Sequence, residues 1–117
     1  MKNLKLFILF TILLTGCSDQ EKPEFILNED EMVNVLIDIH IAEGISSSLP
    51  VSYDSSGVMY TLLEKDVFTK HEITDSVFTQ SMLYYLQYPA EIDEIYGRVV
   101  DSLSKKQALY KSQQENQ

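Results

Sequence analysis

The sequence has no tryptophan, only three prolines and four glycines, and a single cysteine. One cysteine excludes an intramolecular disulfide, and the few glycines form no glycine-rich phosphate loop. Cations are also scarce, with nine Lys and Arg against 18 Asp and Glu. The resulting net charge of −9 repels phosphate backbones, so we expect no nucleic-acid partner.

Motifs for catalysis and metal binding are missing too. The chain contains no CxxC or HExxH pattern, no serine in a GxSxG turn, and only two histidines, His40 and His71. Because no convergent set of polar residues is visible, we expect a protein that is not an enzyme and that carries no cofactor.

The N-terminus carries the clearest signal. The first five residues hold two lysines and no acid, and residues 6–14 form a nearly unbroken apolar run. That length is typical of a signal peptide and is too short for a transmembrane helix, which needs about 20 apolar residues. The run ends in Leu-Thr-Gly-Cys at positions 14–17, which resembles a lipobox. We predict that residues 1–16 are a lipoprotein signal peptide and that Cys17 is lipidated.

Lipidation would anchor the mature chain to a membrane, because two or more acyl chains bind durably. Residues 17–26 are polar near their start and contain Pro23, so we interpret them as a flexible tether. Loss of the signal peptide removes two of the nine cations and no acid, which leaves seven against 18 and a net charge of −11. We expect a lipid-anchored protein of the cell envelope, at the outer membrane, and leave open whether it faces the periplasm or the surface.

The mature chain is predicted to be all-α, a small bundle of three to four helices over residues 27–104. Asn28 is a favourable N-cap, and Glu31 completes a capping box for a helix that runs to about Gly44. A loop over residues 46–57 follows, because serines, Pro50 and Gly57 gather there.

Two further helices are expected over about 56–70 and 75–87, with Thr74 as the cap of the latter. Pro89 suits the first turn of a fourth helix. Its apolar residues repeat at helical spacing as far as Leu103. Residues 105–117 are interpreted as a frayed polar tail.

Polar residues on the first helix break its pattern. At 100° per residue, Glu43 falls on the core stripe with His40 beside it, while Asp38 points away. We interpret His40 and Glu43 as structural, bonded to each other or to tyrosine hydroxyls. The alternative is a small-ligand or metal site at this i, i+3 pair, although catalytic zinc requires three protein ligands.

Three tyrosines cluster before Pro89, namely Tyr84, Tyr85 and Tyr88. Adjacent helical residues lie about 100° apart, so one of the first two is expected in the core. Tyrosine is enriched at protein interfaces. We therefore predict that another envelope protein docks around Tyr84 and Tyr88. The rival surface is the Ile41 and Ile45 side of the first helix, if no other helix covers it.

Several segments together resemble a known family. They are Asp38-Ile39-His40-Ile41-Ala42-Glu43, the stretch from Phe78 to Tyr84-Tyr85, and Ile95-Tyr96 with Leu103. In order and spacing they are similar to small Bacteroidota lipoproteins of the domain-of-unknown-function family 4296, over about residues 27–103. The resemblance implies a short helical lipoprotein domain and no established activity.

Lipidation is the first testable prediction. Metabolic labelling with a fatty acid should mark the full-length chain and should not mark Cys17→Ala, because the cysteine sulfur receives the diacylglycerol. Label that persists in Cys17→Ala would contradict the lipobox interpretation.

Overall fold

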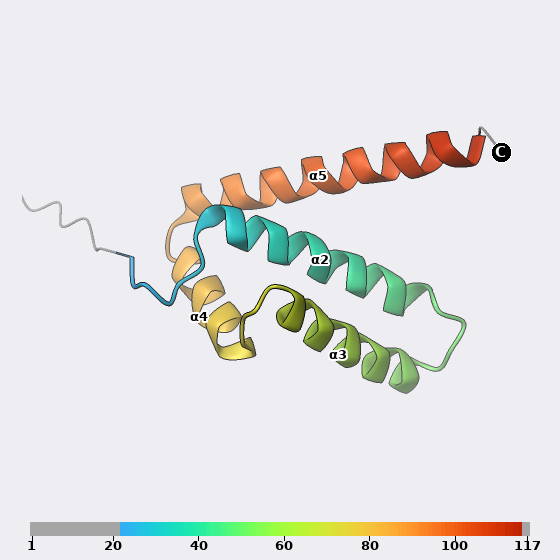
Figure 1. Cartoon of the computed structure of the whole chain (residues 1–117), viewed down its shortest axis with the longest axis horizontal. Coiled ribbons are helices and arrows are strands. Elements are labelled where there is room, and N and C mark those ends of the chain that lie inside the picture. Colours follow the sequence, from blue (N-terminus) through green and yellow to red (C-terminus); the bar gives the residue numbers. More distant parts are fainter. Residues whose placement is uncertain (1–21, 116–117) are drawn as a thin grey trace, which may run out of the picture.

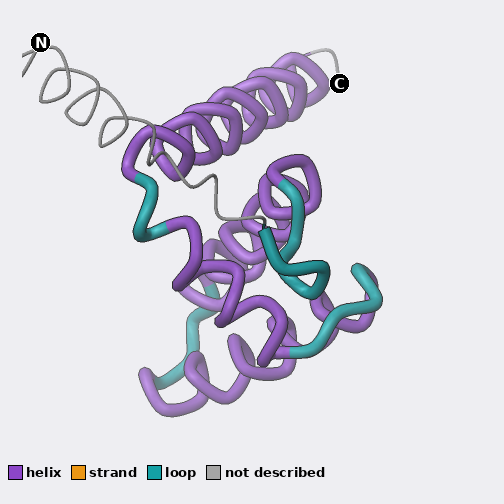
Figure 2. The backbone as a smooth tube through the Cα atoms, turned by 90° about the vertical axis from the view of Figure 1, so that its left-hand side faces the viewer, coloured by secondary structure: helices purple, strands orange, loops and turns teal. Residues whose placement is uncertain are grey.

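The computed structural model describes residues 22–115, which form four helices and no strand. They are α2 (Glu29–Ser48), α3 (Tyr53–Lys70), α4 (Asp75–Tyr85) and α5 (Pro89–Glu115), shown in Figure 1. This confirms the predicted small all-α bundle, and Figure 2 shows short loops joining its helices. None of these helices combines the length and apolar character that a membrane span needs. The signal peptide and Cys17 lie outside the described residues.

The central helix α2 lies between α3 and α5 and contacts both. α3 runs antiparallel to α2 and α5 runs parallel to it, while the short helix α4 lies at the end of the bundle where α2 begins (Figure 1). Because α2 has neighbours on several sides, its N-terminal half is buried almost all round. The buried apolar residues of α2 are Met32, Val33, Val35, Leu36, Ile37, Ile39 and Ala42.

Local side-chain chemistry sets where the helices begin. The Asn28 side chain accepts a hydrogen bond from the backbone N–H of Glu31 at 2.9 Å, and the Glu31 carboxylate accepts one from the N–H of Asn28 at 2.8 Å. This is the predicted capping box. Thr74 caps α4 as predicted, accepting from the N–H of Val77 at 3.2 Å.

Helix ends differ from the sequence prediction at three points. α3 begins at Tyr53 inside the loop expected over residues 46–57, because the Ser52 side chain caps it by accepting from the N–H of Ser55. α2 does not stop at Gly44 but continues to Ser48, and the hydroxyls of its last three serines donate to carbonyls of the preceding turn. α5 continues to Glu115, where a frayed tail was expected from residue 105. Its last turns lack proline and glycine and are rich in Lys, Gln, Ala and Leu, which favour helix.

The segment before α2 is fixed to α4 rather than forming a free tether. The backbone N–H of Leu27 donates to the Ser81 hydroxyl at 2.9 Å, and the Tyr85 hydroxyl donates to the Leu27 carbonyl at 2.8 Å. Both polar groups of one buried residue are therefore satisfied by α4. Lys22 also donates to the Tyr85 hydroxyl, and its ammonium lies 4.5 Å from the centroid of that ring. The expected tether is thus held to the domain at Lys22 and at Ile26, which is in the core, whereas residues 23–25 between them are exposed.

The Tyr85 hydroxyl should contribute measurably to stability. Burial is the main reason that the pKa of Tyr85 rises to about 12, so the hydroxyl stays protonated and donates at neutral pH. We expect Tyr85→Phe to lower the free energy of unfolding by about 1–3 kcal/mol, because the buried Leu27 carbonyl loses its donor. Urea unfolding followed by circular dichroism measures this loss. The control Tyr110→Phe, at a side chain that is 68% exposed, should change it by about 0.5 kcal/mol or less. Equal unfolding midpoints for the two variants would contradict the assignment.

Candidate functional site

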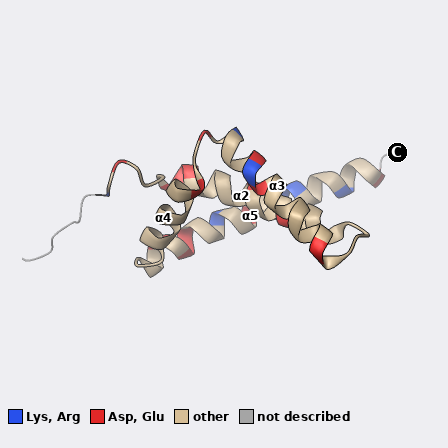
Figure 3. Ribbon diagram, turned by 90° about the horizontal axis from the view of Figure 1, so that it is seen from below, with Lys and Arg blue, Asp and Glu red and all other residues tan. Residues whose placement is uncertain are grey.

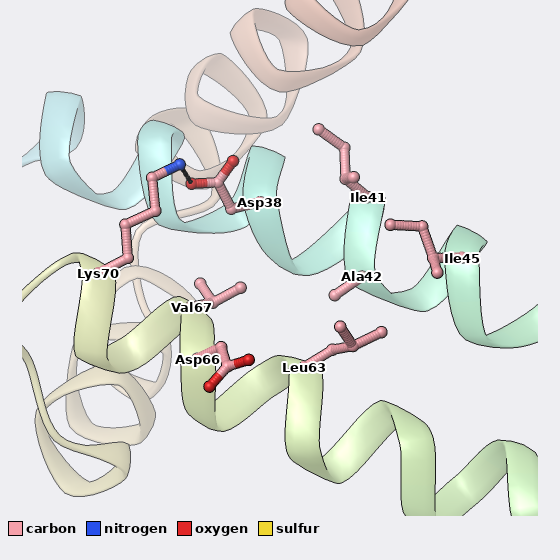
Figure 4. A pocket seen from close by; sticks show the side chains of 8 residues that line it. All are labelled: Asp38, Ile41, Ala42, Ile45, Leu63, Asp66, Val67 and Lys70. Atoms are coloured by element: carbon pink, nitrogen blue, oxygen red, sulfur yellow. Dashed lines mark hydrogen bonds and ion pairs between the residues drawn. The ribbon is translucent and has the colours of Figure 1, made fainter.

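An apolar groove of about 360 Å³ runs between α2 and α3, on a side of α2 that no helix within residues 22–115 covers. Figure 4 shows its side chains converging from the two helices. Ile41 and Ile45 form the α2 wall, and they are 37% and 47% exposed although both are large and apolar. The complete lining is Asp38, Ile41, Ala42, Ile45, Leu63, Asp66, Val67 and Lys70.

The groove is open because of how α2 is surrounded. α3 and α5 flank α2, and α4 with the preceding segment packs against its N-terminal half. Ile41 and Ile45 point to the remaining side, four residues apart and thus on the same face of the helix. α3 adds to this open side, because Met59 and Leu62 are exposed and lie about one turn before Leu63 and Asp66. The result is an apolar surface shared by two helices.

One rim of the groove is an ion-pair cluster centred on Asp38. Its carboxylate accepts from the Lys70 ammonium at 2.7 Å and lies 2.8 Å from the Nε2 atom of His71. Asp38 and His71 are both half-buried, with 21% and 19% of their side chains exposed. Burial alone would raise the pKa of Asp38, but the hydrogen bonds from Lys70 and His71 outweigh it and hold that pKa below its usual value.

The turn after α3 brings His71 to this cluster. Glu72 adopts the left-handed conformation, with φ of 55°, and its N–H donates to the Thr69 carbonyl. The N–H of Ile73 donates to the Phe68 carbonyl at 3.0 Å. These two bonds define a Schellman motif, in which the residue after the C-cap is left-handed. The motif ends α3 at Lys70, with His71 as the C-cap.

The side chains of His40 and Glu43 were expected in or beside the core, and that expectation was wrong. Their side chains are 35% and 62% exposed, and His40 Nδ1 lies 3.4 Å from Glu43 Oε2. Glu43 faces the start of α3, where it lines a pocket with Tyr53, Ser56 and Tyr60. His40 instead packs edge-on against the Tyr96 ring of α5, with centroids 6.1 Å apart. Residues 22–115 hold no group of three or more His, Cys, Asp or Glu side chains arranged for a metal.

Asp38 was also misplaced by the sequence pattern, because it was expected to point away from the body of the protein. Its partners, Lys70 and His71, are 32 and 33 residues away along the chain. No spacing rule connects such distant positions. The only available signal was a histidine and a lysine at the end of a predicted helix.

Of the three tyrosines before Pro89, one lies in the core and two are partly exposed. Tyr85 is completely buried, which confirms that one of the adjacent pair belongs to the core. Tyr84 and Tyr88 are half-buried and pack on each other, with ring centroids 4.9 Å apart. Docking at Tyr84 and Tyr88 stays a prediction.

The pKa shift of Asp38 implies a pH dependence of stability. Because its folded-state pKa lies below the usual 3.8, the ionised carboxylate stabilises the fold above that pH and loses this effect as the pH falls further. We expect Asp38→Asn to be less stable than the wild type at pH 7, with a gap that narrows below pH 3.8. Urea unfolding across this pH range measures the gap.

The matched control is Asp101→Asn, which removes an exposed carboxylate paired with Lys105. It should change the unfolding free energy by about 0.5 kcal/mol or less, because exposed pairs within one helix contribute little. A destabilisation of Asp38→Asn that is equally large at pH 7 and pH 3 would show that the charge of Asp38 is not its source.

Comparison with known proteins gives one match to a family and none to individual proteins. No curated protein and no solved structure matches the chain. The model of the family described as "Domain of unknown function (DUF4296)" matches residues 23–108. This range includes all of α2, α3 and α4 and most of α5, and with them every residue that lines the groove between α2 and α3. The chain therefore belongs to the DUF4296 family.

Proposed function

We propose that this chain is a lipoprotein of the cell envelope, anchored at the outer membrane through Cys17, whose helical domain binds another protein without catalysing a reaction. The observation that carries the proposal is the uncovered groove between α2 and α3. Two large aliphatic side chains, Ile41 and Ile45, are more than a third exposed on the helix that supplies half of the buried apolar residues. Exposed apolar patches bounded by polar residues are typical of protein-binding sites.

The groove fits an amphipathic helix better than an extended peptide. Its walls are helices, and residues 22–115 contain no strand edge to which a peptide could add. Its floor and walls are aliphatic, and the charged residues at its edges are Asp38, Asp66 and Lys70, of which Asp38 and Lys70 are paired with each other. The matching partner is a helix with apolar residues at i, i+3 and i+4.

Site-specific photo-crosslinking in living cells tests this proposal. A photoreactive amino acid in place of Ile45 should give a covalent adduct with a protein, because that side chain would lie inside the interface. The same substitution at Lys65 is the control, since Lys65 is exposed on the other side of α3, beside Phe68 and Thr69. No adduct at position 45, or equal adducts at both positions, would contradict the proposal.

A further inference from the structure

A polar pocket, separate from the apolar groove, lies between the end of α2 and the start of α3. Its volume is about 270 Å³, and no residue that lines it also lines the groove. Five of its seven lining residues carry a hydroxyl group and one carries a carboxylate, so oxygen atoms set its chemistry. The seven are Glu43, Ser46, Ser47, Tyr53, Ser56, Gly57 and Tyr60.

The protons of four of these hydroxyls are already used inside the chain. Ser46 and Ser47 both donate to one carbonyl of the preceding turn, at 2.9 and 2.7 Å, and Ser56 donates to the Ser46 carbonyl at 2.7 Å. The Tyr60 hydroxyl donates to the Glu64 carboxylate at 3.1 Å. A carbonyl or an ionised carboxylate can only accept, so the direction of all four bonds is fixed. The four hydroxyl oxygens therefore offer lone pairs, and not protons, to a molecule that enters the pocket.

Within the described chain, no Lys or Arg lines this pocket. Residues 23–64 contain neither, although they contain eight Asp and Glu. In Figure 3 the end of α3 beside its loop to α2 shows red and no blue. The Glu43 carboxylate is 62% exposed, and its contact with the Nδ1 atom of His40 is long, at 3.4 Å. An incoming cation would thus meet a carboxylate that no lysine or arginine of the pocket neutralises.

The pKa of Tyr60 reports the same negative field. It is raised to about 12, mainly by burial and then by the negative charges of Glu64 and Glu43. Both carboxylates therefore act on a hydroxyl that lines the pocket. Asp54, in the first turn of α3, offsets the positive end of that helix, and the last turn of α2 holds no basic residue.

Gly57 leaves space in the wall of the pocket. It lies within α3, where glycine is about 1 kcal/mol less favourable than alanine. Its φ is not positive, and a Cβ atom at this position would meet nothing within 4 Å. Neither backbone conformation nor packing thus requires glycine here, and a larger side chain would reduce the volume of the pocket that Gly57 lines.

We propose that this pocket binds an organic cation, namely an alkylammonium or alkylguanidinium group. Such a group carries a positive charge and only hydrogen-bond donors, which complement a lining of acceptors with one carboxylate. A sugar needs donors as well as acceptors, and an anion would face Glu43. The Tyr53 ring, 93% exposed, adds an aromatic face of the kind on which cations bind. One carboxylate in a pocket of this volume suits a bulky monovalent cation better than a small divalent metal ion.

Titration of the isotope-labelled full-length chain in mild detergent, followed by two-dimensional NMR at about 0.15 M salt, tests this proposal. The probes are butylammonium and butylguanidinium, and the control is butylurea, an uncharged analogue of the second probe. We expect both cations to shift the backbone amide signals of Ser46, Ser47 and Gly57 in a saturable manner. Butylurea should leave these signals unchanged, because it brings no charge to Glu43.

Two variants locate the binding. Glu43→Gln should weaken the binding of butylguanidinium about threefold, the effect expected for loss of a partly exposed ion pair. Gly57→Leu should abolish binding, because the new side chain occupies the pocket. The matched controls Glu94→Gln and Gly97→Leu make the same changes at exposed positions of α5 and should bind like the wild type. Circular dichroism should show equal helix content in all four variants.

Three outcomes would overturn the proposal: no saturable shift with either cation, equal shifts with butylurea, or binding that is unchanged in both Glu43→Gln and Gly57→Leu. A blocked tripeptide, acetyl-glycyl-arginyl-glycine amide, distinguishes two sources of the cation. Binding as tight as that of butylguanidinium indicates that the pocket receives a side chain of another protein, and no binding of the tripeptide indicates a free small molecule. Failure at this pocket leaves the proposed function standing, because the photo-crosslink at Ile45 tests a different surface.

Discussion

The backbone of Leu27 fixes the segment before α2 to α4, because side chains of α4 bond to both its N–H and its carbonyl. The Ser81 hydroxyl accepts from its N–H and the Tyr85 hydroxyl donates to its carbonyl, and all three residues are buried. A buried backbone group without a hydrogen-bond partner costs about 1–3 kcal/mol. Separation of the segment before α2 from α4 would leave the N–H and the carbonyl of Leu27 without their partners. This contact places α4 at the N-terminal end of α2, and the position of α4 in turn decides which part of α2 is covered.

The incomplete covering of α2 accounts for the candidate site. A helix that is apolar almost all round needs neighbours on every side. α2 has α3 and α5 on its flanks and α4 near its start, and no element of the described chain covers Ile41 and Ile45. Glu43 lies on another side of α2, where it is 62% exposed and lines a pocket with residues at the start of α3.

The groove between α2 and α3 carries charged residues at its rim, with Asp38, Asp66 and Lys70 among those that line it. The ion pairs from Lys70 and His71 to Asp38 fix the rim of the groove, so that a binding partner meets a formed edge rather than a mobile side chain. A rim that is already ordered reduces the entropy lost on binding.

The sequence by itself determined that the domain is all-α and where α2, α4 and α5 begin, whereas α3 begins at Tyr53, before the expected start at about residue 56. Caps such as Asn28 and Thr74 act on N–H groups three residues away, and helical periodicity is equally local. The apolar character of α2 on nearly every side also indicated a central position in the bundle. The tertiary structure alone decided the pairing of Asp38 with His71 and of Leu27 with Ser81 and Tyr85, which lie 33, 54 and 58 residues apart. It also decided that Glu43 is solvated and that Ile41 and Ile45 are left uncovered. These outcomes depend on where neighbouring helices end and on the angles at which they cross, and no interaction within one helical turn specifies either.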